Sequence, residues 1–448
     1  MHPVRCIRMA GMAQESLEER GRQAAHFFAL QREQLRSQIS FELELSSEES
    51  DDDSDVEEGV LSSFTMHLHR ETQVHVKSWQ QPSQKPTGRA ASGRNDKPRL
   101  TMPHGEFEEM TGFNPQHFVE AAALFKKVPK KIVTKRRNAA SRELVLTIML
   151  MRWRMKETRT WNHVAKVLNI NRSIVNDLYM EGIKRIFEVK DYRVLSTHID
   201  MPRVYKMLED MTDAVELKGG LVEGVIGLLD GTGRATCRPS AQAGKRKFDH
   251  YDMQRLCFNG HYGGHGTKVQ FVTLFDSITT IWVELMSQHD SHTLACSKIE
   301  AQLRAVTLPG HTQHPKLYGD PAYSRSDVIE RKGKGVRDDK QTQLDDSMIP
   351  IRAMVEDSIG GFGNVFPFFD NGARKLHQLL RKSRVSYKQE IIVSNLFLNL
   401  RCCAYGNQVS SYFTCIPPPS MEAYMHNANS GLLVRYLEAV PGCDGDCI

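Results

Sequence analysis

The order of strand and helix patterns in the second half of the chain most restricts what the chain can fold into. A short apolar run at 225–229 precedes two β-rich runs, 269–275 and 280–286, which flank Asp276-Ser277 as a hairpin would. This order predicts a mixed α/β domain over residues 218–425. Further patterns follow the hairpin in this order: a helix at 292–306, a strand at 317–318, and helices at 349–359 and 389–403.

Residues 104–190 show apolar residues at helical spacing and predict an all-α region. Ser141 is expected to cap one helix, Thr160 a second and Ser173 a third, with a short turn at 169–171. The apolar positions of the second and third helices have the spacing of a helix-turn-helix, which leaves a polar face free for the major groove of DNA.

Charge supports a nucleic-acid partner for this region. Between residues 124 and 190 there are 17 Lys and Arg and 5 Asp and Glu, a net charge of +12. The alternative is a small helical bundle whose Lys and Arg side chains are merely solvated. The residues expected to contact DNA are Lys135, Arg136, Arg137, Lys166, Arg172 and Asn176.

The first 103 residues are expected to be a disordered region that contains an acidic block and a linker. The block at 41–60 carries ten acidic residues and no Lys or Arg; without it the chain has 59 basic and 44 acidic residues, a net charge of +15. A basic body beside an acidic segment suggests a polyanionic partner, with the block either masking the basic surface or serving as a solubilising tail.

Other features exclude several protein classes. The 448 residues contain no apolar run of about 18 residues, so no membrane-spanning helix is expected, and the first twenty residues have no apolar core typical of a signal peptide. The nine cysteines match no zinc motif, which favours a reducing, intracellular compartment.

Three carboxylates are candidates for a common site. Asp230 follows an apolar strand, Asp320 follows Leu317-Tyr318-Gly319, and Glu356 lies on a predicted helix. Two strand-end aspartates and a helix-borne glutamate can bind two Mg²⁺ ions, which activate a water or 3′-hydroxyl in phosphodiester transfer. The alternatives are an Asp-Gly turn, a simple strand end, and a Glu356 paired with Arg352.

A family resemblance rests on an ordered series of short segments rather than on any one of them. Together they resemble the DDE endonuclease domain of PIF/Harbinger-type transposases over roughly residues 220–425. The segments are Leu229-Asp-Gly-Thr232 with Cys237-Arg-Pro239, Phe258-Asn-Gly-His261, Lys268-Val-Gln-Phe271, Gln288-His-Asp-Ser291, Leu317-Tyr-Gly-Asp-Pro-Ala-Tyr323, Val355-Glu356 with Gly363, and Ala404-Tyr-Gly-Asn-Gln408.

The resemblance implies an RNase H-like fold and cut-and-paste transposition of double-stranded DNA in the nucleus. It assigns catalysis and two Mg²⁺ (or Mn²⁺) ions to Asp230, Asp320 and Glu356, and it sets Asp290 near the site, although Asp290 could equally be a helix N-cap. It further implies a Myb-like partner protein and an oligomeric active form. The expected domains are 1–103, helical 104–190, a connector at 191–217, the endonuclease domain at 218–425 and a tail at 426–448.

The sequence departs from the family pattern beside these motifs. Tyr262-Gly263-Gly264-His265 stand where basic residues are usual, and Asp357 follows Glu356 where an aromatic residue is usual. Fewer positive charges weaken contacts with substrate phosphates. The alternative function is therefore a domesticated transposase that binds DNA or chromatin without catalysis.

Overall fold

The computed structural model describes residues 103–155, 161–238, 250–333, 335, 338–369 and 385–443, all of which belong to one unit, Pro82–Ile448. The expected acidic block and the helix cap at Thr160 lie outside the described residues. Within the described part of the chain, no helix has the length and apolar character needed to cross a membrane.

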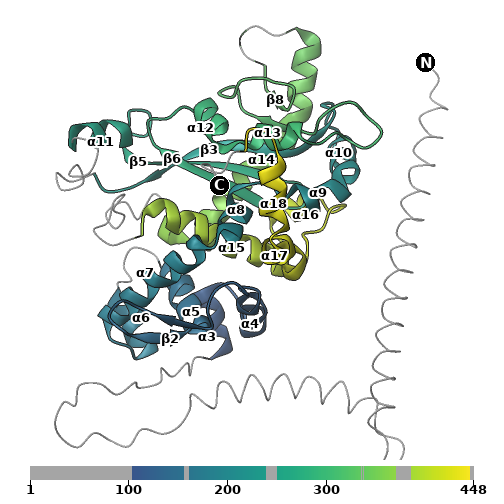
Figure 1. Cartoon of the computed structure of the whole chain (residues 1–448). Helices are drawn as coiled ribbons and strands as arrows, with labels where there is room; N and C mark the ends of the chain where they lie inside the picture. Colours follow the sequence, from purple (N-terminus) through teal and green to yellow (C-terminus); the bar gives the residue numbers. More distant parts are fainter. Residues whose placement is uncertain are drawn as a thin grey trace, which may run out of the picture. The chain divides into compact units, whose positions relative to one another are not determined.

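A mixed six-stranded sheet organises the structure (Figure 1). Its strands are β3 (Val225–Ala235), β4 (Phe258–Asn259), β5 (Gly264–Leu274), β6 (Thr279–Leu285), β7 (Lys316–Gly319) and β8 (Ile329–Arg331). β3, β5 and β6 pair antiparallel, whereas β7 and β8 extend the sheet from the other side of β3 as parallel strands. β4 pairs with the start of β5. The expected mixed α/β class is confirmed.

The hairpin signal at Asp276-Ser277 is confirmed as the turn between β5 and β6. Ser277 adopts a left-handed φ of 70°, and the Ile278 N–H donates to Asp276 Oδ1 at 3.1 Å. A short polar side chain that bonds to the backbone two residues on is the usual way in which Asp shapes a tight turn.

β3 is longer than the apolar run predicted. Asp230 therefore lies within the strand and not at its end, because residues 230–235 continue to pair with β5 after β7 has ended at Gly319. The expected strand end at Asp230 is therefore wrong, and so is the alternative of an Asp-Gly turn. A glycine inside a strand can instead mark a close approach of another group to the backbone.

Helices pack on both faces and on the β6 side of the sheet. Their bounds are α8 (Lys190–Thr197), α9 (Met201–Val204), η1 (Tyr205–Met207), α10 (Leu208–Leu217), α11 (His250–Cys257), α12 (Asp290–Ser297), α13 (Ile299–Arg304), α14 (Asp339–Val365), η3 (Pro367–Phe369), α15 (Tyr387–Tyr405), α16 (Gln408–Tyr412), α17 (Met421–Ser430) and α18 (Leu432–Ala439). α14 packs on β3 and β5, α12 on β5 and β6, and α8 and α15 on β6. The expected single helix at 292–306 is wrong, since left-handed Lys298 (φ 58°) separates α12 from α13.

The N-terminal part of the described chain forms a second group of elements: α3 (His104–Thr111), α4 (Pro115–Ala123), β1 (Lys131–Val133), β2 (Ala139–Ser141), α5 (Arg142–Trp153), α6 (Trp161–Leu168) and α7 (Arg172–Glu188). The expectation of an all-α region is wrong here, because β1 and β2 pair as an antiparallel hairpin. The β-branched Ile132-Val133 and the turn that follows supply a local preference for it.

Helix ends in this group test the capping predictions. Ser141 caps α5, since its hydroxyl accepts a hydrogen bond from the Leu144 N–H at 3.2 Å. Ser173 does not cap α7. Asn171 takes the N-cap position, and its Oδ1 accepts from both the N–H (2.9 Å) and the hydroxyl (2.8 Å) of Ser173. Asn is as good a cap as Ser, and here it comes two residues earlier in the chain.

An aromatic cluster joins the two groups of elements. Phe397 of α15 stacks on Phe125 at 5.1 Å and meets Trp153 of α5 edge-on at 5.6 Å between ring centroids. The indole N–H of Trp153 also donates to the Tyr179 hydroxyl of α7 at 3.0 Å. The helical group therefore shares its core with α15, which in turn packs on β6.

Candidate functional site

Two of the three predicted acids lie side by side. β3 and β7 run parallel with Leu229 opposite Gly319, so the next residues, Asp230 and Asp320, stand where the two strands separate. The carboxyl ends of adjacent parallel strands are a common place for a binding crevice. Backbone N–H groups orient both side chains: that of Gly231 donates to Asp230 Oδ1 (2.7 Å) and that of Ala322 to Asp320 Oδ1 (2.8 Å).

The environment of Asp230 disfavours its charged form. Burial is the main cause and raises the pKa of its carboxyl to about 6. The negative charges of Asp320 and Asp290 raise the pKa further, while the Gly231 N–H and the Arg352 charge oppose the rise. Neighbouring carboxylates in a buried place repel one another, and a bound cation would relieve that repulsion.

Asp230 faces helix α14. Side chains alternate along a strand, so Arg234 lies on the same face as Asp230, and its guanidinium stands 5.5 Å from the ring of Phe362 in α14. The same helix carries Glu356, the third predicted acid. Glu356 is 58% exposed, however, and its carboxylate accepts a hydrogen bond from Arg352 at 2.8 Å. The pairing with Arg352 that the sequence allowed is thus observed.

Asp290 approaches β3 from the other face of the sheet. A β-carbon added to Gly231 would overlap its Oδ1, so the carboxylate rests directly against the strand backbone. Its partner is Lys268 of β5, whose ammonium lies 2.7 Å from Oδ1 and whose side chain is 9% exposed. The capping alternative for Asp290 is wrong, because His289 holds the N-cap position of α12 without a capping hydrogen bond.

Tyr323 and Lys268 are residues near these acids to which the sequence assigned no role. The Tyr323 ring is buried, and its hydroxyl makes no hydrogen bond to the described residues. Burial, followed by the negative charges of the three aspartates, raises its pKa well above the usual value. Tyr323 and Lys268 lie inside the quoted motifs, which is the sequence signal that could have found them.

The donor set suits Mg²⁺ in part. Asp230 and Asp320 offer adjacent carboxylate oxygens, which are the ligands that Mg²⁺ prefers. Among the described residues, however, no three His, Cys, Asp or Glu side chains are grouped closely enough to hold a metal ion. Asp230 and Asp320 are thus the two predicted acids that offer neighbouring oxygen ligands, whereas the carboxylate of Glu356 is bound to Arg352.

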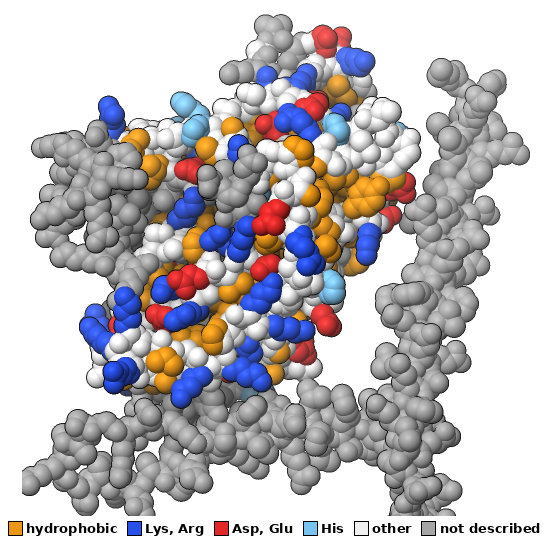
Figure 2. Space-filling model, in the orientation of Figure 1, with side chains coloured by type: hydrophobic (Ala, Val, Ile, Leu, Met, Phe, Trp, Pro, Cys, Tyr) orange, Lys and Arg blue, Asp and Glu red, His pale blue; other side chains and the backbone are white. Residues whose placement is uncertain are grey.

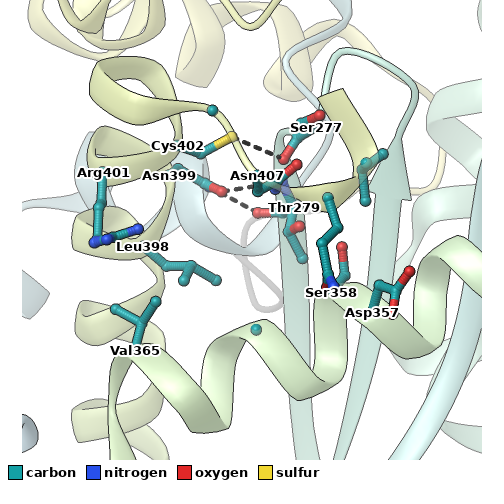
Figure 3. Close-up of a pocket in the computed structure, with 14 residues that line it drawn as sticks. Ser277, Thr279, Asp357, Ser358, Val365, Leu398, Asn399, Arg401, Cys402 and Asn407 are labelled. Atoms are coloured by element: carbon teal, nitrogen blue, oxygen red, sulfur yellow. Dashed lines mark hydrogen bonds between the residues drawn. The ribbon is translucent and has the colours of Figure 1, made fainter. Parts of the chain in front are cut away.

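A small cavity of about 60 Å³ lies elsewhere, between α14, α15, α16 and the β5–β6 turn. Figure 3 shows Asp357 and Ser358 on one side of it and Asn399, Arg401 and Cys402 on the other. Its polar groups bond to one another, as in the 2.8 Å bond from Asn399 to the Thr279 carbonyl. The cavity has room for a water molecule or two, and none of the three predicted acids lines it.

The residues predicted to contact DNA lie in the helical group. Lys135, Arg136 and Arg137 form the turn between β1 and β2, Lys166 is on α6, and Arg172 and Asn176 are on α7. All of them are exposed except Asn176, which is half-buried. Figure 2 shows several Lys and Arg side chains at this end of the described structure.

The close approach of Asp290 predicts the effect of a side chain at position 231. Gly231→Ala is expected to destabilise the chain by about 1–3 kcal/mol, because Lys268 holds the carboxylate that the new methyl group would overlap. Gly360→Ala in α14 is the control: its β-carbon meets open space, so it should stabilise by up to about 1 kcal/mol. Urea unfolding measures both, and equal stabilities would contradict the packing of Asp290 on β3.

Comparisons with models of known protein families, with curated proteins and with solved structures give no match.

Proposed function

We propose that the chain is a metal-dependent DNA endonuclease or transposase with an RNase H-like catalytic sheet, acting on double-stranded DNA in the nucleus. The strand arrangement supports the fold: an antiparallel meander of β3, β5 and β6 continued by parallel β7 and β8 is what an RNase H-like sheet requires. The α6–α7 pair, joined at residues 169–171, supports a helix-turn-helix upstream of it.

The juxtaposition of Asp230 and Asp320 carries this proposal. Two carboxylates that repel each other where β3 and β7 separate lower the stability of the folded chain. Perturbed carboxylates of this kind are typical of functional sites, and a bound cation would offset their repulsion. Glu356 on α14 is the third carboxylate that the family resemblance implies. Arg352 connects it to the site, because Arg352 donates a hydrogen bond to Glu356 and its charge also acts on the pKa of Asp230.

In the proposed reaction, Asp230 and Asp320 would hold Mg²⁺ or Mn²⁺, and the backbone N–H groups of Gly231 and Ala322 orient their carboxylates for this. The ion would supply charge neutralisation at the phosphate and a lower pKa for the attacking water. Arg352 has a second role. Its guanidinium binds phosphate as readily as carboxylate, so a DNA phosphate that takes it from Glu356 frees that side chain to complete the set.

A second candidate function is DNA or chromatin binding without catalysis. The exposed ion pair between Glu356 and Arg352 favours it, because this pairing leaves two adjacent acids instead of three. In such a protein the Arg352–Glu356 pair would persist when DNA and Mg²⁺ are added.

Plasmid nicking in Mg²⁺ or Mn²⁺ distinguishes the two functions. The wild-type chain is expected to nick supercoiled DNA with either metal and not in EDTA. Asp320→Asn should lower the rate at least about 100-fold, because it removes a metal ligand. Glu356→Gln should also lower the rate, whereas Asp357→Asn, one residue away but lining the separate cavity, should not. Absence of metal-dependent nicking, or equal rates for Asp320→Asn and Asp357→Asn, would favour the non-catalytic candidate.

A further inference from the structure

The β1–β2 hairpin presents three consecutive cationic residues on a closed turn. The Thr134 N–H donates to the Asn138 carbonyl (2.8 Å) and the Arg137 N–H to the Thr134 carbonyl (2.9 Å), with Arg137 in the left-handed region at φ 63°. The Asn138 N–H also donates to Thr134 Oγ1 at 3.2 Å. Lys135, Arg136 and Arg137 are therefore held at the tip of an ordered hairpin, with exposed side chains.

The hairpin is anchored to α7. Ile132 of β1 is buried, and β1 packs against that helix. At the tip, Arg136 forms an ion pair with Asp177 of α7 at 3.3 Å. At the base, the Arg142 N–H donates to the Lys130 carbonyl at 2.8 Å. The position of the tip relative to α7 is set by these contacts.

The charge of the hairpin and its surroundings points to a polyanion. Residues 124–141 include seven Lys and Arg and no Asp or Glu. On α7, the exposed Arg172 begins the helix, and the negative charge of Asp177 is offset by its ion pair with Arg136 of the tip. Lys166 of α6 adds another exposed cation. A second stretch of the printed sequence, residues 371–389, has a similar density, with six Lys and Arg and no Asp or Glu, but most of it lies outside the described residues.

We infer that the β1–β2 hairpin is a DNA-binding wing: its tip contacts the backbone of a duplex while the first turns of α7 face the adjacent major groove. This inference rests on the proposed function, since it takes DNA as the partner. A two-stranded ribbon and a helix are the two elements whose dimensions match the major groove of DNA, and the buried Ile132 together with the Arg136–Asp177 pair places the hairpin beside α7. The wing thus adds phosphate contacts that fix the position and orientation of α7 on the duplex.

The salt dependence of DNA binding tests the wing. The full chain carrying Asp230→Asn, in EDTA, is titrated with a labelled duplex of mixed sequence at several salt concentrations. The slope of log K against log salt is negative, and each phosphate contact contributes about −0.9 to it. Lys135→Ala/Arg137→Ala is therefore expected to make the slope less steep by about 2. The control, Lys206→Ala/Arg435→Ala, removes two exposed charges of η1 and α18 and should leave the slope unchanged. Arg136 is kept so that its pair with Asp177 persists.

Each outcome has a distinct meaning. An unchanged slope in Lys135→Ala/Arg137→Ala, beside a wild-type slope that shows DNA binding, overturns the wing and leaves the proposed function standing. Absence of duplex binding by the parent chain at any salt concentration defeats the proposed function itself. A third measurement uses a peptide of residues 41–58, the acidic block. If Lys135→Ala/Arg137→Ala abolishes binding of this peptide but leaves DNA binding unchanged, the hairpin binds the chain's own acidic block and the wing is overturned.

Discussion

Asp230→Asn is expected to abolish metal-dependent cleavage and, at the same time, to raise the free energy of unfolding at pH 7 by about 2–3 kcal/mol. The second effect follows from the pKa of Asp230, which burial raises from 3.8 to about 6 in the folded chain. One pKa unit corresponds to about 1.4 kcal/mol, and the pKa of Asp230 rises by about two units on folding. Ionising this carboxyl at neutral pH therefore costs the folded state about 2–3 kcal/mol. Asparagine carries no charge and can still accept the hydrogen bond from the Gly231 N–H.

The pH dependence has a defined sign. Between pH 3.8 and about 6 the folded chain binds more protons at Asp230 than the unfolded chain does, so this group makes stability fall as pH rises through that window. The gain from Asp230→Asn should be near zero at pH 4 and complete above pH 6. Urea unfolding at several pH values measures it. A gain that does not vary with pH, or a loss of stability at pH 7, would show that burial does not penalise the charge of Asp230.

Two further measurements connect this cost with function. Glu356→Gln should change stability little, because its side chain is mostly exposed and its ion pair with Arg352 is a surface pair. Mg²⁺ should raise the melting temperature of the wild-type chain and leave that of Asp230→Asn unchanged, since a ligand stabilises the state that binds it. The carboxylate of Asp230 would then explain why the folded chain is less stable without metal and more stable with it.

Local signals explain what the sequence could predict. The β5–β6 hairpin follows from Asp276-Ser277 between two β-rich runs, and the start of α5 follows from Ser141, whose hydroxyl caps its own helix. Residues close in sequence determine these features. The expectation that a strand follows at residues 317–318 and ends before Asp320 is confirmed for the same reason.

Long-range pairing explains what the sequence could not predict. β3 extends past Asp230 because β5, more than thirty residues later, pairs with it there, and no local pattern reveals that partner. The approach of Asp290 to Gly231 and its pairing with Lys268 depend on the packing of α12 across the sheet. Asp230 and Asp320 could be expected to meet, and the local pairing of Glu356 with Arg352 is one alternative in the sequence. The choice between that pairing and a site shared with the aspartates depends on how α14 packs on β3, which is a long-range contact.

A buried ion cluster at the β5–β6 turn predicts the second large effect. Arg203 of α9 pairs with Asp276, the fully buried residue of the β5–β6 turn, and its Nε lies 3.8 Å from Asp200 Oδ2. Asp200 also accepts a hydrogen bond at 2.8 Å from Asn427 of α17. The expected connector at 191–217 therefore carries a cation that ties the turn of the sheet to two helices.

Arg203→Met is expected to destabilise the chain by about 3–5 kcal/mol, because it leaves two buried carboxylates without their cation. Arg304→Met is the matched control. Its pair with Asp327 is exposed, with both side chains more than 40% accessible, and its loss should cost less than about 1 kcal/mol. Urea unfolding at pH 7 with fluorescence detection compares the two.

A double substitution separates lost charge pairing from lost packing. Asp276→Asn added to Arg203→Met removes one of the stranded charges, so part of the lost stability should return, whereas Asp276→Asn alone should destabilise. Additive losses in the double variant would mean that the packing of Arg203 matters and its charge does not. Nicking activity measured on the same variants below their unfolding transitions should stay near the wild-type rate, because Asp276 lies in the β5–β6 turn, five residues beyond Phe271, the β5 residue opposite Asp230.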